Sequence, residues 1–176
     1  MILVDPQLDT NPAPPPGAKL PSVRSLSRFL KEAQAAVRLR GEVTVLLTTD
    51  AAIRNLNRRF RGKNKPTDVL SFPVENLIQS PEKGDLAISV ETALKQSMEQ
   101  DHSLAIEIKI LILHGLLHLA GYDHESDSGQ MQRRERTLRA QLRLPEGLIE
   151  RMHGQSASQR VSKSARQRKP ARRRKP

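Results

Sequence analysis

Aromatic residues and cysteine are scarce in this 176-residue chain, which has three Phe, one Tyr, no Trp and no Cys. Without cysteine the chain forms no disulfide and lacks the usual fourth ligand of a closed structural zinc site. With so few aromatic side chains it offers no platform on which the bases of single-stranded RNA stack. Phe29, Phe60 and Phe72 are expected in the core by their positions. The lack of cysteine fits a reducing compartment.

A long uninterrupted apolar run is also missing. The most apolar stretch, Leu104 to Ala120, contains Glu107, Lys109 and two histidines, and it is too short to cross a bilayer. The N-terminal Met-Ile-Leu-Val-Asp-Pro has neither the basic start nor the long apolar segment of a secretory signal. We therefore expect no transmembrane segment, no signal peptide and no membrane partner.

Acidic residues are absent from the C-terminal end of the chain. From Arg151 to Pro176 there are ten Lys or Arg and no Asp or Glu, whereas residues 1–150 hold 20 basic and 19 acidic residues. Of the net charge of +11, the tail therefore carries +10 and residues 1–150 carry +1. Because the tail cannot bury enough apolar surface to offset the entropy of ordering, we predict that 151–176 is disordered and follows a domain at 1–150. It either holds RNA phosphates as an accessory or serves only as a solubilising extension.

Apolar periodicity and turn residues divide residues 1–150 into strands and helices. A Pro-rich loop at 10–21 looks like an insert, because Pro removes backbone donors. Gly41 is expected to end the first long helix. Strands are expected at about 2–4, 42–48, 68–74 and 85–90, and helices at about 22–40, 51–60, 91–100, 103–120 and 127–142. Because adjacent strands mix with helices, we predict a single α+β domain with one small mixed β-sheet packed with helices.

Three of the five histidines lie in one short segment, His114-Gly-Leu-Leu-His118-Leu-Ala-Gly121-Tyr-Asp-His124. His114 and His118 are four residues apart, so on a helix they project from the same face. Gly121 can end that helix and let the chain turn back, which brings His124 to the same place. Three nitrogen ligands leave a fourth position for water, which is typical of a catalytic zinc site. The sequence therefore predicts a metal site on a helix and the loop after it.

The same ligand spacing is found in the metzincin proteases, which carry a Glu as general base directly after the first histidine. Here that position is Gly115, which argues against a standard zinc peptidase. A metal still polarises a phosphoryl oxygen and lowers the pKa of bound water, so phosphoester hydrolysis remains open. Asp123 and Glu125 flank His124. Each either orients a histidine by accepting its second N–H or is simply an acid at a helix start.

A basic group lies at residues 54–65, which contain six Lys or Arg and no acid. Arg54 and Arg58 are one helical turn apart and fit a solvated helix face. The residues from Arg61 to Lys65 lie in a loop and are better placed to bind phosphate. We infer recognition of RNA by charge and shape, with specificity supplied by a partner. The predicted RNA contacts are Arg59, Arg61, Lys63 and Lys65.

These segments resemble the motifs of a known family. The histidine segment is similar to the signature of the bacterial YbeY endoribonucleases, the rRNA maturation factors. Asn55-Leu-Asn-Arg-Arg-Phe-Arg61-Gly-Lys-Asn-Lys-Pro-Thr-Asp-Val-Leu-Ser-Phe-Pro73 resembles the second motif of that family, and Gly84-Asp85-Leu-Ala-Ile-Ser89 resembles the third. The three motifs occur in the family's order within about residues 42–145.

The resemblance implies a zinc-dependent, single-strand-specific endoribonuclease that acts in 16S rRNA 3′-end maturation and ribosome quality control in the bacterial cytoplasm. It implies one Zn²⁺ per chain on the three motif histidines, where other divalent metals could serve, and no organic cofactor. The implied partners are rRNA, the small ribosomal subunit and ribosome-assembly factors. Candidate catalytic residues are Arg61, from the second motif, Asp85, from the third, and Asp123, beside the last histidine.

Other classes of function remain open at this point. The ligand spacing leaves an atypical zinc metallopeptidase as one alternative. A ribosome-assembly factor with a structural metal and no catalysis is a second. A third is a general nucleic-acid binder that acts through its basic tail alone. The sequence does not identify a general base.

Overall fold

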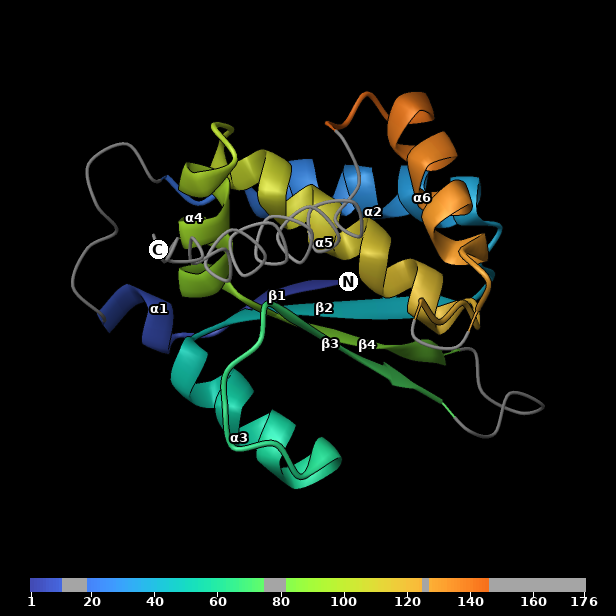
Figure 1. Ribbon diagram of the computed structural model, residues 1–176. Coiled ribbons are helices and arrows are strands. Elements are labelled where there is room, and N and C mark those ends of the chain that lie inside the picture. The colour runs from blue at the N-terminus through green and yellow to red at the C-terminus, as the bar shows by residue number, and fades with distance from the viewer. Residues whose placement is uncertain (11–18, 75–81, 125–126, 146–176) are drawn as a thin grey trace, which may run out of the picture.

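The computed structural model describes residues 1–10, 19–74, 82–124 and 127–145 and shows a four-stranded sheet with helices on both faces (Figure 1). This confirms the predicted α+β fold with one mixed sheet. The predicted strands and helices are all present, with bounds shifted by up to three residues. The strands are β1 (Ile2–Val4), β2 (Glu42–Thr48), β3 (Val69–Pro73) and β4 (Glu82–Ser89), and the helices are α1 (Gln7–Thr10), α2 (Val23–Val37), α3 (Asp50–Arg61), α4 (Val90–Glu99), α5 (Leu104–Leu119) and α6 (Gln130–Gln141).

The strands lie in the order β1-β2-β4-β3. β1, β2 and β4 are parallel, and β3 runs antiparallel along β4 at one edge. Successive side chains of a strand point to opposite faces, so each central strand has two sets of neighbours. On β4, Leu86 and Ile88 belong to the main core, whereas Ala87 between them belongs to a smaller cluster on the other face.

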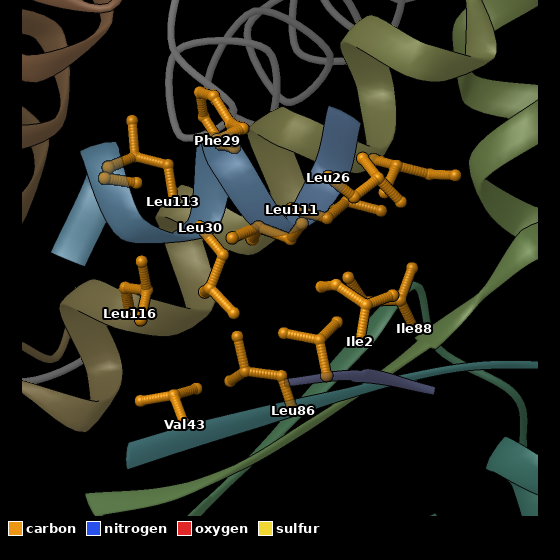
Figure 2. Close-up of a cluster of buried hydrophobic side chains, with 14 of the residues drawn as sticks. Ile2, Leu26, Phe29, Leu30, Val43, Leu86, Ile88, Leu111, Leu113 and Leu116 are labelled. Carbon is orange, nitrogen blue, oxygen red and sulfur yellow. The ribbon is translucent and has the colours of Figure 1, made fainter. Parts of the chain in front are cut away.

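The main core lies between the sheet and the helices α2 and α5 (Figure 2). α2 presents one apolar stripe to it, as its sequence pattern predicts. α5 is different, because it is apolar on nearly all sides and is covered by β3 and β4, α2, α4 and α6. A helix that is apolar all round can only be stable when neighbours surround it. The side chains of α5 that reach this core include Ile108, Leu111, Ile112, Leu113, Leu116 and Leu117.

α3 covers the opposite face of the sheet, where Ile53 packs on Leu70 and Ala87. The sheet therefore separates α3 from α5. The prediction that Phe60 is a core residue is wrong, because its side chain is 57% exposed. It sits near the end of α3 and contacts Phe72 edge to face, with ring centroids 5.1 Å apart. Phe29 is buried and Phe72 is partly buried, as their positions suggested.

Helix ends show how local chemistry sets the bounds. Ser22 caps α2 by accepting a hydrogen bond from the Ser25 backbone N–H, 3.3 Å away. The helix does not run to Gly41 as expected. It ends at Val37, because Arg38 adopts the left-handed conformation with φ 66°.

The short helix α1 was not predicted and takes up the first residue of the expected Pro-rich loop. Residues 11–18 of that loop and the predicted tail lie outside the described residues.

The N-termini of α3 and α4 are tied together at the far end of the sheet. Asp50 of α3 accepts hydrogen bonds from the hydroxyls of Ser89 and Thr92, and Glu91 of α4 accepts one from the Asp50 backbone N–H. Glu91 therefore binds a free N–H at the start of α3, and Asp50 links the two helix starts through the hydroxyls of α4 and its N-cap Ser89.

Among the described residues, no single helix is long and apolar enough to cross a membrane. α4 and α5 reach the required length and composition only together, across a bend of 112°.

Candidate metal centre

The last two turns of α5 and the loop after them build the site. His114 and His118 lie one turn apart on α5, which ends at Leu119. Gly121 then adopts a φ of +89°, a conformation that suits glycine, and the chain turns back toward the helix. The turn brings His124 against both other rings, with centroids 5.5 Å from His114 and 5.3 Å from His118. The structure thus brings together the three histidines that the sequence singled out.

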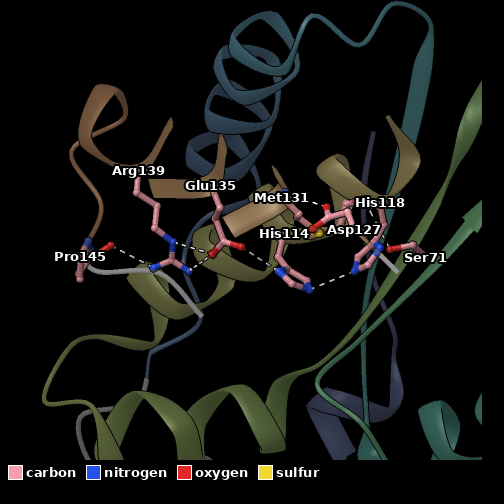
Figure 3. A network of polar contacts seen from close by, with 9 residues as sticks. Ser71, His114, His118, Asp127, Met131, Glu135, Arg139 and Pro145 are labelled. Carbon is pink, nitrogen blue, oxygen red and sulfur yellow. Dashed lines mark hydrogen bonds and ion pairs between the residues drawn. The ribbon is translucent and has the colours of Figure 1, made fainter. Parts of the chain in front are cut away.

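A buried network of charged side chains contacts His114 and fixes its orientation (Figure 3). His114 Nδ1 lies 3.1 Å from Glu135 Oε2 of α6. The other oxygen of Glu135, Oε1, accepts from Arg139 Nε at 2.8 Å and pairs with Nη2 at 2.7 Å. Arg139 Nη1 donates to the Pro145 carbonyl at 3.0 Å. Because a carboxylate only accepts hydrogen bonds, Nδ1 of His114 carries the proton and the lone pair is left on Nε2.

His118 presents its own Nε2 to the same point, 3.2 Å from Nε2 of His114. Its burial, together with the nearby rings of His114 and His124, lowers the pKa of His118 to about 4. A hydrogen bond to the backbone of Tyr122 and the charge of Asp123 act in the opposite direction but do not cancel the shift. At neutral pH the imidazole is therefore neutral, which is the form that binds a metal.

The geometry fits a metal ion with nitrogen ligands. One ligand nitrogen from each ring lies within 4.8 Å of the others. Zinc with bonds of about 2.0–2.1 Å and tetrahedral angles holds its nitrogen ligands about 3.3 Å apart. The Nε2 atoms of His114 and His118 already have this separation. His114 is buried and His124 is exposed, so the cluster opens to solvent on one side, as a site that admits substrate requires.

Gly115 allows α5 to lie directly on the sheet. A Cβ atom at this position would sit 2.7 Å from Cδ2 and 2.9 Å from Cδ1 of Leu86 on β4. Any larger residue at position 115 would therefore clash with the side chain of Leu86 unless that side chain moved. This packing adds a structural reason to the chemical one against a peptidase, since the position of the missing general base faces the sheet.

Asp123 lies beside the histidines, as expected from its place in the sequence. Its charge acts on His118, and it makes further contacts within the fold. Asp85 is placed differently. It is exposed on β4, and because side chains alternate along a strand it shares the face of Ala87, which α3 covers. Glu125 lies outside the described residues.

The predicted RNA contacts also lie on the α3 side of the sheet. Arg61 is the last residue of α3 and is exposed, and Lys63 and Lys65 follow it in the exposed loop. Arg59 stacks on Phe60 with its guanidinium carbon 5.4 Å from the ring centroid. The structure therefore separates these cations from the three histidines by the thickness of the sheet (Figure 1).

Glu135 and Arg139 are the functional candidates that the sequence did not reveal. Both are almost fully buried, at 1% and 2% exposure. One signal was present in the sequence. Met131, Glu135 and Leu138 are spaced by four and three residues, so Glu135 occupies a position of the apolar stripe of its helix. A charged residue at such a position calls for a buried partner.

Comparisons with known proteins show the family of this chain and agree with its fold. The family model described as endoribonuclease YbeY matches residues 21–143. A protein of Koribacter versatilis named endoribonuclease YbeY is 54% identical over 130 residues, covering 74% of this chain and 84% of the relative. One of Solibacter usitatus with the same name is 48% identical over 128 residues, covering 73% and 84%. The solution structure of a Thermotoga maritima protein has a TM-score of 0.50 at 23% identity, covers 98% of this chain and 100% of its own, and supports the fold alone.

Proposed function

Because the chain belongs to the YbeY endoribonuclease family, we propose that it is a metal-dependent hydrolase that cuts single-stranded RNA with a zinc ion bound by His114, His118 and His124. The observation that carries this proposal is the convergence of three imidazoles on one point at the end of α5. Other divalent metals could take the same ligands, because imidazole binds several of them.

Three side chains around the proposed metal site have separate roles in this proposal. Glu135 keeps the proton of His114 on Nδ1, and Arg139 neutralises that carboxylate inside the protein. Asp123 adds negative charge beside His118 and in this proposal steadies that ring. A bound metal would polarise the phosphoryl oxygen and lower the pKa of a water molecule. Hydrolysis would join a water oxygen to phosphorus and break the P–O bond to the leaving oxygen, and that oxygen would take up a proton in exchange for the one lost by the water.

Arg61 and Asp85 are proposed as further catalytic residues, and Arg59, Arg61, Lys63 and Lys65 as RNA contacts. All of these side chains are exposed, which supports contact with RNA. For the four cations, the absence of any acid between positions 54 and 65 is a second support. Since they lie on the α3 side of the sheet, the RNA would have to pass around a sheet edge to meet both them and the histidines. β3 is the nearest edge, because Phe72 contacts Phe60 on one face and Ser71 contacts α5 on the other.

The proposed cellular role is maturation of the 16S rRNA 3′ end and ribosome quality control in the cytoplasm. It follows from the family to which the chain belongs. The partners would be rRNA, the small ribosomal subunit and its assembly factors. In this proposal residues 1–150 form the nuclease domain, and the basic tail at 151–176 adds affinity for RNA without reading its sequence.

The direct test is cleavage of a precursor 16S rRNA 3′ fragment by wild type and by His114→Ala, with chelator and with added zinc. We expect cleavage only by zinc-loaded wild type. Equal cleavage by both proteins would reveal a contaminating nuclease and contradict the proposal. A zinc-loaded wild type that binds the fragment but does not cut it would favour the non-catalytic assembly factor instead.

A further inference from the structure

Phe60 is the one aromatic side chain that this protein exposes. All four aromatic residues lie in the described ranges, where Phe29 is buried and Phe72 and Tyr122 are partly buried. Phe60 is 57% exposed. A single exposed apolar side chain is common on a protein surface and means little by itself. The groups around the ring therefore decide whether it has a ligand.

The ring of Phe60 is held at a fixed place. It belongs to the last turn of α3, and the C-cap of that helix is Gly62, whose N–H donates to the Arg58 carbonyl at 3.2 Å. Phe72 of β3 contacts the ring, with the two ring planes 70° apart. Because Phe72 packs on the small cluster under α3, it supports the ring from the sheet. A ring that is already positioned loses little conformational entropy when it binds a ligand.

Arg59 provides a flat, charged group beside the ring. Its guanidinium carbon lies 5.4 Å from the centroid of Phe60. A guanidinium both stacks on aromatic rings and binds phosphate oxygens. A nucleotide combines a flat base with a phosphate, so these two side chains match both of its parts. An apolar pocket of a protein partner would have to take the guanidinium out of water, which is costly. A nucleotide therefore fits this pair of side chains better than an apolar protein surface does.

The loop after α3 is tied to the same helix. Asn57 is buried, and its Nδ2 donates to the Lys65 carbonyl at 2.8 Å. The Lys63 N–H donates to the Asn57 carbonyl at 3.3 Å. Arg54 Nε donates to Asn64 Oδ1 at 2.9 Å. The loop that carries two of the proposed phosphate contacts therefore folds back on α3, the helix that carries the exposed ring.

The edge strand β3 connects this place with the three histidines. Phe72 and Ser71 are adjacent on β3, so their side chains point to opposite faces of the sheet. Phe72 contacts Phe60 on one face. On the other face, Ser71 Oγ lies 3.5 Å from the carbonyl oxygen of Gly115, which follows His114. An RNA strand that runs around this edge, from the histidines to the cations of α3, therefore passes Phe60.

We propose that Phe60 binds one unpaired base of the RNA by stacking, with Arg59 beside it, at a nucleotide outside the bond placed at the histidines. This inference deepens the proposed nuclease function and rests on it. The number of aromatic residues argues against a platform for several bases but leaves room for one. Such a site accepts any base, because every base has a π-face. It favours single-stranded RNA, because the bases of a duplex already stack on one another.

The test measures RNA binding by wild type, Phe60→Ala and Phe60→Tyr. Met98→Ala is the matched control, since Met98 is another large apolar side chain exposed on a helix, on α4. Affinity is measured on full-length, chelator-treated protein at several salt concentrations, so that binding is observed without cutting. Two ligands are compared, a single-stranded RNA and a chain of the same length and charge that lacks the bases.

Loss of one stacked base should weaken the binding of RNA by Phe60→Ala about 5- to 150-fold. The slope of log K against log salt should stay at the wild-type value, because no phosphate contact is removed. Phe60→Tyr keeps the aromatic ring and should bind RNA as wild type does, and Met98→Ala should as well. Wild type and Phe60→Ala should bind the chain without bases equally.

Three results would overturn the proposal. These are equal binding of RNA by wild type and Phe60→Ala, an equal loss on the chain without bases, and a loss in Phe60→Tyr as large as that in Phe60→Ala. Equal binding of RNA would leave the ring to solvent or to a protein partner. If zinc-loaded wild type never cuts RNA but the base-dependent loss appears, the proposed function fails while the base site stands. If zinc-loaded wild type cuts RNA but Phe60→Ala binds it normally, the base site fails and the proposed function stands.

Discussion

Glu135 of α6 lies 3.1 Å from Nδ1 of His114 and is itself paired with Arg139, so the ring of a proposed metal ligand is fixed by a helix 21 residues further along the chain. All three side chains are buried. The arrangement removes rotation and tautomer exchange from His114 before any metal arrives. Metal-binding histidines commonly have such a partner, and its loss typically lowers metal affinity 10- to 100-fold.

Two substitutions of Glu135 distinguish the effect of its negative charge from the effect of its hydrogen bond with His114. Glu135→Ala leaves Arg139 buried without its ion pair, so we expect a loss of about 3–5 kcal/mol in the free energy of unfolding and weaker zinc binding. Glu135→Gln keeps an acceptor for His114 Nδ1 and should retain more zinc affinity than the Ala variant. Competition with a chelator and urea unfolding measure the two effects. Wild-type zinc affinity in Glu135→Ala would show that the contact does not position His114.

We predict that position 115 requires glycine because a larger residue would clash with Leu86, and not because of helix propensity. Gly115→Ala gains up to about 1 kcal/mol from propensity but places a methyl group against the Leu86 side chain, and overpacking costs about 1–3 kcal/mol. We expect a net loss of stability in the wild-type background. In a Leu86→Ala background the same change should be neutral or stabilising. Urea unfolding of the four proteins gives the coupling, and purely additive effects would contradict this account.

The low pKa of His118 predicts an acid-sensitive metal-free protein. Because its pKa falls from 6.5 in the unfolded chain to about 4 in the fold, the unfolded state binds the proton more readily between these values. The stabilisation is therefore complete above about pH 6.5 and is lost as the pH falls toward about 4. Chelator-treated wild type and His118→Gln are compared by urea unfolding at several pH values. Wild type should show the steeper decline in this window, and parallel curves would refute the assignment.

Arg61 should matter for cleavage and not for metal binding, because it lies at the end of α3 on the other side of the sheet. If its guanidinium reaches the reacting phosphate around the β3 edge of the sheet and stabilises its charge, Arg61→Ala should lower kcat/KM by about 10²- to 10³-fold. Zinc affinity and thermal unfolding should stay at the wild-type values. Arg58→Ala, an exposed cation on the same helix, is the matched control and should have little effect on cleavage. Equal effects of the two substitutions would remove the special role of Arg61.

Local signals in the sequence were sufficient for most of the fold and for the three histidines. The apolar stripe of α2, the caps Ser22 and Ser103, and the spacing of His114 and His118 all depend on residues within a few turns of one another. Errors arose where tertiary context decides. α2 ends before Arg38, which adopts the left-handed conformation, and not at Gly41 as predicted, and Phe60 is exposed near the end of α3.

The partner of His114 could not be predicted from local pattern. Glu135 becomes its neighbour only after α6 packs on α5. In the same way, the sequence assigns Arg61 and the three histidines to one catalytic site. In the structure, the sheet lies between Arg61 and the histidines. Such relationships depend on which face of a strand each neighbouring helix covers.

The measurement that tests the central claim most directly is a zinc titration of metal-free wild type with RNA cleavage as the readout. The account predicts no cleavage at the start, a rate that rises in proportion to bound zinc, and a plateau at one zinc per chain. His118→Ala should stay inactive throughout. Full activity in the metal-free protein, or saturated zinc binding with no cleavage of a single-stranded substrate, would contradict the account.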